Sequence, residues 1–127
     1  MIKVYPAVFH HDSDGIWVEF PDVPGCTTCG ATIEETMDLA QEALGLHLAT
    51  LIEEKLPVPE ATNIASMEKG ENEFLSYVYT DVEKYFRNTK AVKKTLSIPA
   101  WLAEAAEEKH LSLSKILQEG LKSRLGV

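Results

Sequence analysis

The sequence predicts an α+β protein built from two parts. Residues 1–87 combine short apolar runs of strand character with one long apolar stripe at helical spacing. The remaining residues show one short strand pattern followed by two helical patterns. The charge changes sign as well, because residues 1–87 hold 16 acidic and 5 basic side chains, whereas residues 88–127 hold 4 acidic and 7 basic ones. We therefore expect one domain over residues 1–87 and a second over residues 91–127.

The composition is that of an ordinary globular protein, with 45% hydrophobic and 25% charged residues in a chain of 127. The first residues lack the basic stretch and long apolar run of a secretory signal. No window approaches the roughly 20 apolar residues that a membrane span needs. We therefore expect a cytoplasmic protein with no membrane contact.

The first part begins with a predicted hairpin. Residues 2–9 form a strand pattern in which both faces are apolar, and Pro6 favours an edge position or a bulge because it lacks an N–H. The sequence Asp-Ser-Asp-Gly at residues 12–15 is a turn signal, and Ile16, Val18 and Phe20 mark one face of a strand over residues 16–20. A short third strand is expected around residues 26–29.

A long helix follows. Thr32 and Glu35 have the spacing of a capping box, which satisfies free backbone N–H groups at a helix start. Pro57 and Pro59 limit the helix at its other end. The apolar stripe consists of Ile33, Met37, Ala40, Leu44, Leu48 and Leu51.

The rest of the first part is less regular. Residues 60–72 are polar and without periodicity, and residues 73–79 predict another strand. Thr80 or Asp81 is expected to cap a short helix that ends near Arg87.

The second part reads as strand, helix, helix. Residues 93–98 form the strand pattern, and Pro99 then occupies a first-turn position where its missing N–H does no harm. One helix is expected over residues 100–108, and Ser112 is a good N-cap for another that runs to about Arg124.

Because this segment is short, it buries too little apolar surface to fold alone. We therefore expect a second copy of the chain to complete its core. The strands of two copies would pair antiparallel, which turns Lys93, Thr95 and Ser97 away from the core. A two-stranded ribbon fits the major groove of DNA, and the first residues of the second helix offer N–H groups to a phosphate. The residues expected to bind DNA are Lys93, Lys94, Thr95, Ser97, Ser112, Leu113 and Lys115.

This second part resembles the ribbon-helix-helix family of bacterial DNA-binding domains. The matching residues are 93–99 and 111–116, and Gly120 stands where that family tends to keep a small residue. Thr95 and Ser97 are shorter than the Arg, Asn or Gln side chains often found on the ribbon face, which favours weak or water-mediated base reading. The alternative is an ordinary strand-helix-helix subdomain packed on the first part.

The first part resembles the HicB-type antitoxin family. The similarity lies in residues 9–26, above all in Gly-x-Trp-Val-x-Phe-Pro-Asp-x-Pro-Gly at residues 15–25, and continues through residues 28–36 and 40–44. It implies a partly RNase H-like fold and a partner of the HicA type, a small basic toxin that cleaves mRNA. It also implies that the second part binds the operator of its own operon and so represses it. The ribbon itself requires at least a homodimer, and a tetramer by pairing of dimers is a further expectation.

Five residues are candidates for toxin contact, because they are acidic or aromatic and lie near the hairpin: Asp12, Asp14, Trp17, Glu19 and Asp22. The alternative for each is turn chemistry or sheet packing. The acidic charge of residues 1–87 agrees with a basic partner.

Two other classes of function stay open. A metal-dependent RNase H-like nuclease with a DNA-binding tail would use clustered carboxylates such as Asp12, Asp14 and Glu19, and an interaction module would lack DNA binding. We nevertheless expect a protein that is not an enzyme, with no catalytic residue, metal or cofactor.

The lone Cys26-x-x-Cys29 pair has no second pair at zinc-site spacing. His10 and His11 are adjacent on a strand and so face opposite ways.

Overall fold

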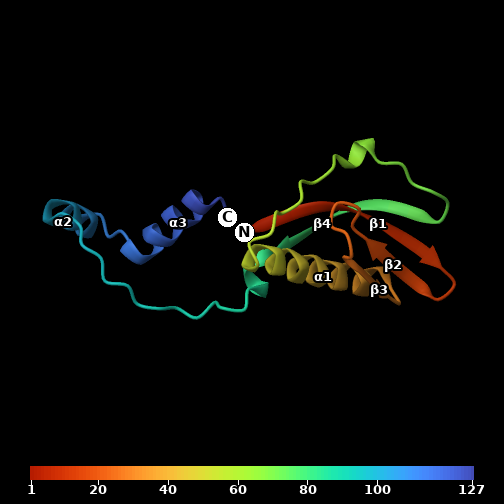
Figure 1. The fold of residues 1–127 in the computed structure, drawn as a ribbon, viewed down its shortest axis with the longest axis horizontal. Helices are drawn as coiled ribbons and strands as arrows, with labels where there is room; N and C mark the ends of the chain where they lie inside the picture. The colour runs from red at the N-terminus through yellow and green to blue at the C-terminus, as the bar shows by residue number, and fades with distance from the viewer. The chain divides into compact units, whose positions relative to one another are not determined.

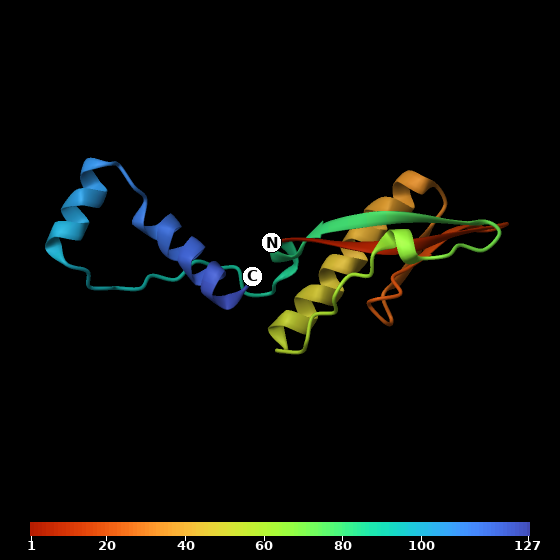
Figure 2. The same cartoon turned by 90° about the horizontal axis from the view of Figure 1, so that it is seen from above.

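The computed structural model describes residues 1–127 and divides them into two compact units, Met1–Thr89 (unit 1) and Lys90–Val127 (unit 2). Unit 1 is a four-stranded antiparallel sheet with one long helix, and Figures 1 and 2 show that helix along one face of the sheet. None of the helices has the length and apolar character needed to cross a membrane. The elements of unit 1 are β1 (Ile2–Asp12), β2 (Gly15–Glu19), β3 (Thr27–Gly30), α1 (Ile33–Glu53), the 3₁₀ helix η1 (Ile64–Ser66), β4 (Glu73–Asp81) and the 3₁₀ helix η2 (Val82–Tyr85).

The strands are ordered β3-β2-β1-β4, so β1 is central and β4 is an edge strand. β4 pairs with β1 from Ile2 to His10, whereas β2 pairs with β1 only from Val8 to Asp12. The first half of β1 therefore has one unpaired edge. Pro6 lies in this half, which agrees with the edge position expected for a residue without an N–H.

The core lies between the sheet and α1. The strand register places alternate side chains on the face toward α1, where they pack against the apolar stripe of the helix. Burial of this apolar surface is the main favourable contribution to the folding of unit 1. The buried core includes Tyr5, Ala7, Phe9, Ile16, Val18, Phe20, Val78, Ala40, Leu44 and Leu48.

The start of α1 follows the predicted capping pattern. The Thr32 hydroxyl accepts a hydrogen bond from the Glu35 N–H at 3.2 Å. The Glu35 carboxylate accepts one from the Ala31 N–H at 3.1 Å, one residue before the N-cap amide that a standard capping box uses. The helix ends at Glu53, and Lys55 then adopts a positive φ of 59°, before Pro57 is reached.

The end of β4 and η2 are fastened to α1 at Gly45. A Cβ atom at this position would lie 2.3 Å from ring carbons of Tyr85 and 2.6 Å from the Thr80 hydroxyl oxygen. Thr80 also donates a hydrogen bond to the carbonyl oxygen of Gln41 at 2.9 Å. The expected helix up to Arg87 is only the short η2, because Thr80 and Asp81 still belong to β4.

Unit 2 contains α2 (Ala100–Glu108) and α3 (Leu113–Leu125). Ser112 caps α3, since its hydroxyl accepts the Lys115 N–H at 3.3 Å. The strand expected over residues 93–98 is not formed in the single chain, where these residues are exposed. A strand needs a neighbour for its backbone groups, and one chain supplies none here. The large apolar side chains left exposed include Leu96, Ile98, Trp101, Leu102, Leu113, Ile116, Leu117, Leu121 and Leu125.

Candidate functional site

The candidate site of unit 1 is the face of the sheet opposite α1, which we call the open face. Figures 1 and 2 show that the segment carrying η1 crosses this side of the sheet. The Ile64 N–H donates to the Tyr77 hydroxyl oxygen at 3.4 Å. By register, the open face carries Ile2, Val4, Pro6, Val8, His10, Trp17, Glu19, Thr27, Cys29, Glu73, Leu75, Tyr77 and Tyr79.

One end of the open face is a cluster around His10. Its imidazole stacks on the Trp17 indole, with ring centroids 3.7 Å apart and planes 7° apart. Nδ1 of His10 lies 2.9 Å from a Glu73 carboxylate oxygen, and Nε2 lies 3.6 Å from a Glu19 carboxylate oxygen. Nε2 is buried without a hydrogen-bond partner. The cluster therefore fixes the orientation of Trp17 and places two carboxylates beside it. No group of three side chains in the chain is arranged to hold a metal ion.

The structure brings together only some of the residues expected to contact a toxin. Trp17 and Glu19 share the open face. Asp12 ends β1 and Asp14 lies in the turn that follows, where the Asp12 carboxylate accepts the Asp14 N–H at 2.9 Å. Asp22 is engaged elsewhere, because its carboxylate accepts both the backbone N–H of Thr62 at 2.9 Å and the Thr62 hydroxyl at 2.5 Å. Asp22 thus fastens the chain before η1 to the β2–β3 loop.

The opposite end of the open face carries a group of exposed apolar and aromatic side chains, with Asp81 opposite Ile2 at its border, and the sequence prediction missed this group. Ile2, Val4, Tyr77 and Tyr79 are exposed by 58%, 44%, 48% and 58%. We call these four residues the apolar patch. Val4 lies directly opposite Tyr79 in the sheet. The alternation of side chains along β1 and β4 places these four residues on one face of the sheet. Because both faces of β1 are apolar in sequence, this alternation could not show which face is covered.

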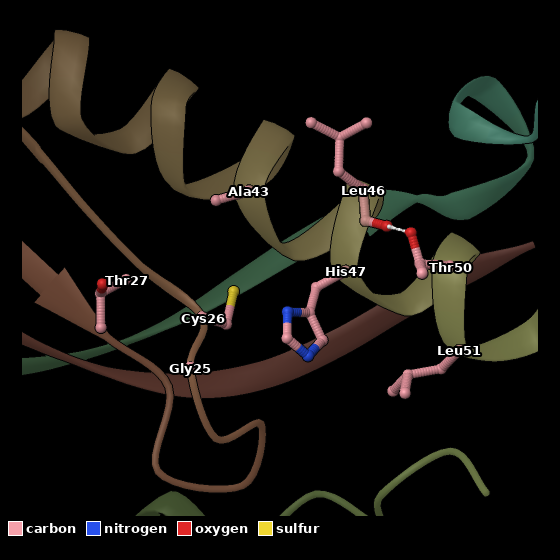
Figure 3. A pocket seen from close by; sticks show the side chains of 8 residues that line it. All are labelled: Gly25, Cys26, Thr27, Ala43, Leu46, His47, Thr50 and Leu51. Carbon is pink, nitrogen blue, oxygen red and sulfur yellow. Dashed lines mark hydrogen bonds between the residues drawn. The ribbon is translucent and has the colours of Figure 1, made fainter. Parts of the chain in front are cut away.

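A second feature is a depression of about 340 Å³ between α1 and the β2–β3 loop, shown in Figure 3. His47 of α1 lies across it from Gly25, and Leu46 and Cys26 also line it. Burial raises the pKa of the Cys26 thiol to about 11, so this thiol stays protonated and is a poor nucleophile or metal ligand at neutral pH. Cys26 and Cys29 are both free.

The residues expected to bind DNA are all exposed in unit 2. Four of them lie in the extended segment before α2, and the other three lie at the start of α3. The Ser112 hydroxyl is occupied by the Lys115 N–H. A ribbon needs strands from two chains, so its pairing stays a prediction.

Comparison with known proteins identifies the family. Residues 5–119 match the model of the HicB_like antitoxin of bacterial toxin–antitoxin systems. An uncharacterized 14.9 kDa protein of Haemophilus phage HP1 is 30% identical over 107 residues, which span 83% of this chain and 80% of that protein.

Two solved structures are similar as well. A chain of a toxin–antitoxin complex from Streptococcus pneumoniae is 29% identical with a TM-score of 0.65, and the match covers 98% of this chain and 99% of that one. A chain of a HicA3 and HicB3 toxin–antitoxin complex is 26% identical with a TM-score of 0.54, over 62% of this chain and 99% of that one. The α+β arrangement of one antiparallel sheet with helices is thus shared with antitoxin structures, and the chain belongs to the family of HicB-like antitoxins of bacterial toxin–antitoxin systems.

Proposed function

We propose that unit 1 of this antitoxin binds and inhibits a small, basic, mRNA-cleaving toxin of the HicA type. Unit 2 binds operator DNA as a dimer or higher oligomer and so represses the antitoxin's own operon. The observation that carries the proposal is the family match over residues 5–119, which spans both units. The similar chains come from a toxin–antitoxin complex and from a HicA3–HicB3 complex, which supports a partner of that type here.

The charge of unit 1 supports a basic partner. Residues 1–87 carry a net charge of −11, from 16 acidic and 5 basic side chains. Such a field raises the rate of encounter with a positively charged protein and disfavours contact with nucleic acid. A partly RNase H-like fold belongs to the same proposal, and the sheet with one long helix on a single face agrees with it.

The exposed apolar surface of unit 2 supports the dimer. The exposed apolar side chains of α2 and α3 have no partner within one chain, and a second copy would bury them. Apart from its chain neighbours and the backbone of its own helix, nothing lies within 4 Å of a Cβ built at Gly120, so the close packing expected there would come from the second copy. Pairing of the segments over residues 93–98 would then satisfy their backbone groups and present Lys93, Thr95 and Ser97 to DNA.

The nuclease alternative has no support in the geometry. Asp12, Asp14 and Glu19 form no cluster of metal-ligating side chains, and Asp12 is engaged in its own turn. The family is one of antitoxins and not of enzymes.

Co-expression with the product of the adjacent reading frame tests the proposal. We expect that product to be a small basic protein that arrests growth and degrades mRNA when expressed alone. Co-expression of this chain should restore growth, and the two proteins should co-purify. Absence of such a partner, or continued growth arrest in the presence of this chain, would contradict the proposal.

A further inference from the structure

We propose that the apolar patch of Ile2, Val4, Tyr77 and Tyr79 is the surface on which the basic toxin docks. The inference rests on the proposed function and adds to it the place of contact. It differs from the sequence prediction, which placed the contact around the β1–β2 hairpin and Asp22.

The patch is contiguous and lies on one face. Val4 is directly opposite Tyr79, and Tyr77 and Tyr79 share a parity on β4. All four side chains are between 44% and 58% exposed, while Pro6, beside Tyr77 on the same face, is fully buried. The η1 segment therefore contacts this face at the Tyr77 hydroxyl but leaves all four residues of the apolar patch exposed. A continuous exposed apolar surface on a folded unit marks an interaction site.

The position of the patch at the edge of the sheet strengthens this assignment. β4 is an edge strand, so the backbone groups on its outer side have no strand partner. Residues 73–81 contain neither a proline nor a lysine, the residues that commonly protect such an edge from pairing. Tyrosine is also enriched at protein interfaces, because it offers a large apolar ring with a polar end.

Charge selects the basic toxin over a second copy of unit 1. The ammonium group of Met1 lies 3.2 Å from Asp81 and 3.1 Å from Glu83, so one positive charge faces two carboxylates beside the patch. Glu60 and Lys3 line the hollow beside Val4, so three carboxylates and two positive charges surround the patch and leave it net negative. Two copies meeting here would bring two negative surfaces together, whereas a basic protein would complement them.

Calorimetric titration of the full chain with the toxin of the adjacent reading frame tests the proposal. Tyr79→Ser and Val4→Ser each replace an exposed side chain of the patch. The matched control is Leu46→Ser, which removes an apolar side chain that is 48% exposed on α1, on the other side of the sheet. We expect Tyr79→Ser and Val4→Ser to weaken binding by about tenfold or more, and Leu46→Ser to bind like the parent. Thermal melts of each free variant confirm that unit 1 is folded.

The outcomes separate the two proposals. A parent chain that does not bind the toxin contradicts the proposed function and this inference together. If the parent binds and the patch variants bind equally well, or if only Leu46→Ser loses binding, the function stands and the patch is not the docking surface. If Tyr79→Ser changes the sedimentation of the toxin-free chain, the patch joins two copies and the inference is wrong.

Discussion

The His10 imidazole lies flat against the Trp17 indole, with 3.7 Å between ring centroids, while its two nitrogens face Glu73 and Glu19. The two rings come from neighbouring strands, since His10 and Trp17 are paired in the register of β1 and β2. The contact therefore links the register of the hairpin to the orientation of the one large aromatic side chain at this end of the open face.

A double-mutant cycle measures this contact. We expect His10→Ala and Trp17→Ala to show a coupling free energy of about 1 kcal/mol in urea unfolding of unit 1, because stacked aromatic pairs contribute that much beyond their burial. His11→Ala is the control, since His11 points to the other face and contacts Phe74 instead. A cycle of His11 and Trp17 should show no coupling, and equal coupling in both cycles would contradict the stacking.

Replacement of Gly45 tests the attachment of η2 to α1. Gly45→Ala should lower the free energy of unfolding by about 1–3 kcal/mol, because the new methyl group overlaps the Tyr85 ring and the Thr80 hydroxyl. Alanine is intrinsically favoured over glycine within a helix by about 1 kcal/mol, so a stabilised variant would show that the clash is absent. In a Tyr85→Ala background, Gly45→Ala should lower the free energy of unfolding by less than it does in the parent.

The buried phenol of Tyr5 predicts a loss of stability at high pH. Its pKa is raised above 10.0, first by desolvation and then by the Asp22 carboxylate, and its hydroxyl donates to the carbonyl oxygen of Pro59. The folded state therefore favours the neutral phenol. This contribution is complete below pH 10 and is lost as the pH rises through the higher pKa of the folded state.

Tyr5→Phe should remove that part of the pH dependence and, at pH 7, lower the free energy of unfolding by about 1 kcal/mol through the lost hydrogen bond. The measurement is the midpoint of urea unfolding at a series of pH values from about 7 to about 11, a range that includes the usual phenol pKa of about 10. Tyr79→Phe leaves Tyr5 in place and should behave like the parent. If Tyr5→Phe keeps the parent's pH dependence, another group is responsible.

Lys93→Ala tests the assignment of the DNA-binding ribbon. In a gel-shift assay with operator DNA, the variant should bind more weakly than the parent, and the parent's affinity should fall steeply with salt because phosphate contacts release counterions. Sedimentation should show the same oligomer for both proteins. A variant that binds like the parent would move the DNA contact elsewhere, and a parent that does not bind would make unit 2 an interaction module.

The parts of the fold that sequence predicted well are determined locally. Thr32 with Glu35 marks the start of α1, and Ser112 marks the start of α3, because each cap needs only residues within a few positions. The path of residues 57–72 could not be predicted. It depends on contacts between distant residues, such as Thr62 with Asp22 and Ile64 with Tyr77, which leave no periodic signal.

The placement of the candidate site residues could be predicted only in part, for the same reason. Strand parity places Trp17 and Glu19 on one face, but it could not show that Asp22 is held by Thr62 or that Val4 and Tyr79 stay uncovered. The strand over residues 93–98 is a different case, because its expected partner belongs to another chain. Its pairing remains a prediction.

The exposed apolar faces of α2 and α3 have a consequence for gene regulation. In the paired arrangement proposed for unit 2, these faces are buried only when two chains meet, so the folded state of the unit follows mass action. As the antitoxin is diluted, the amount of paired unit falls with the square of the amount of free chain. Operator occupancy would then decline more steeply than the antitoxin itself, and a modest drop in its level would be enough to restart transcription.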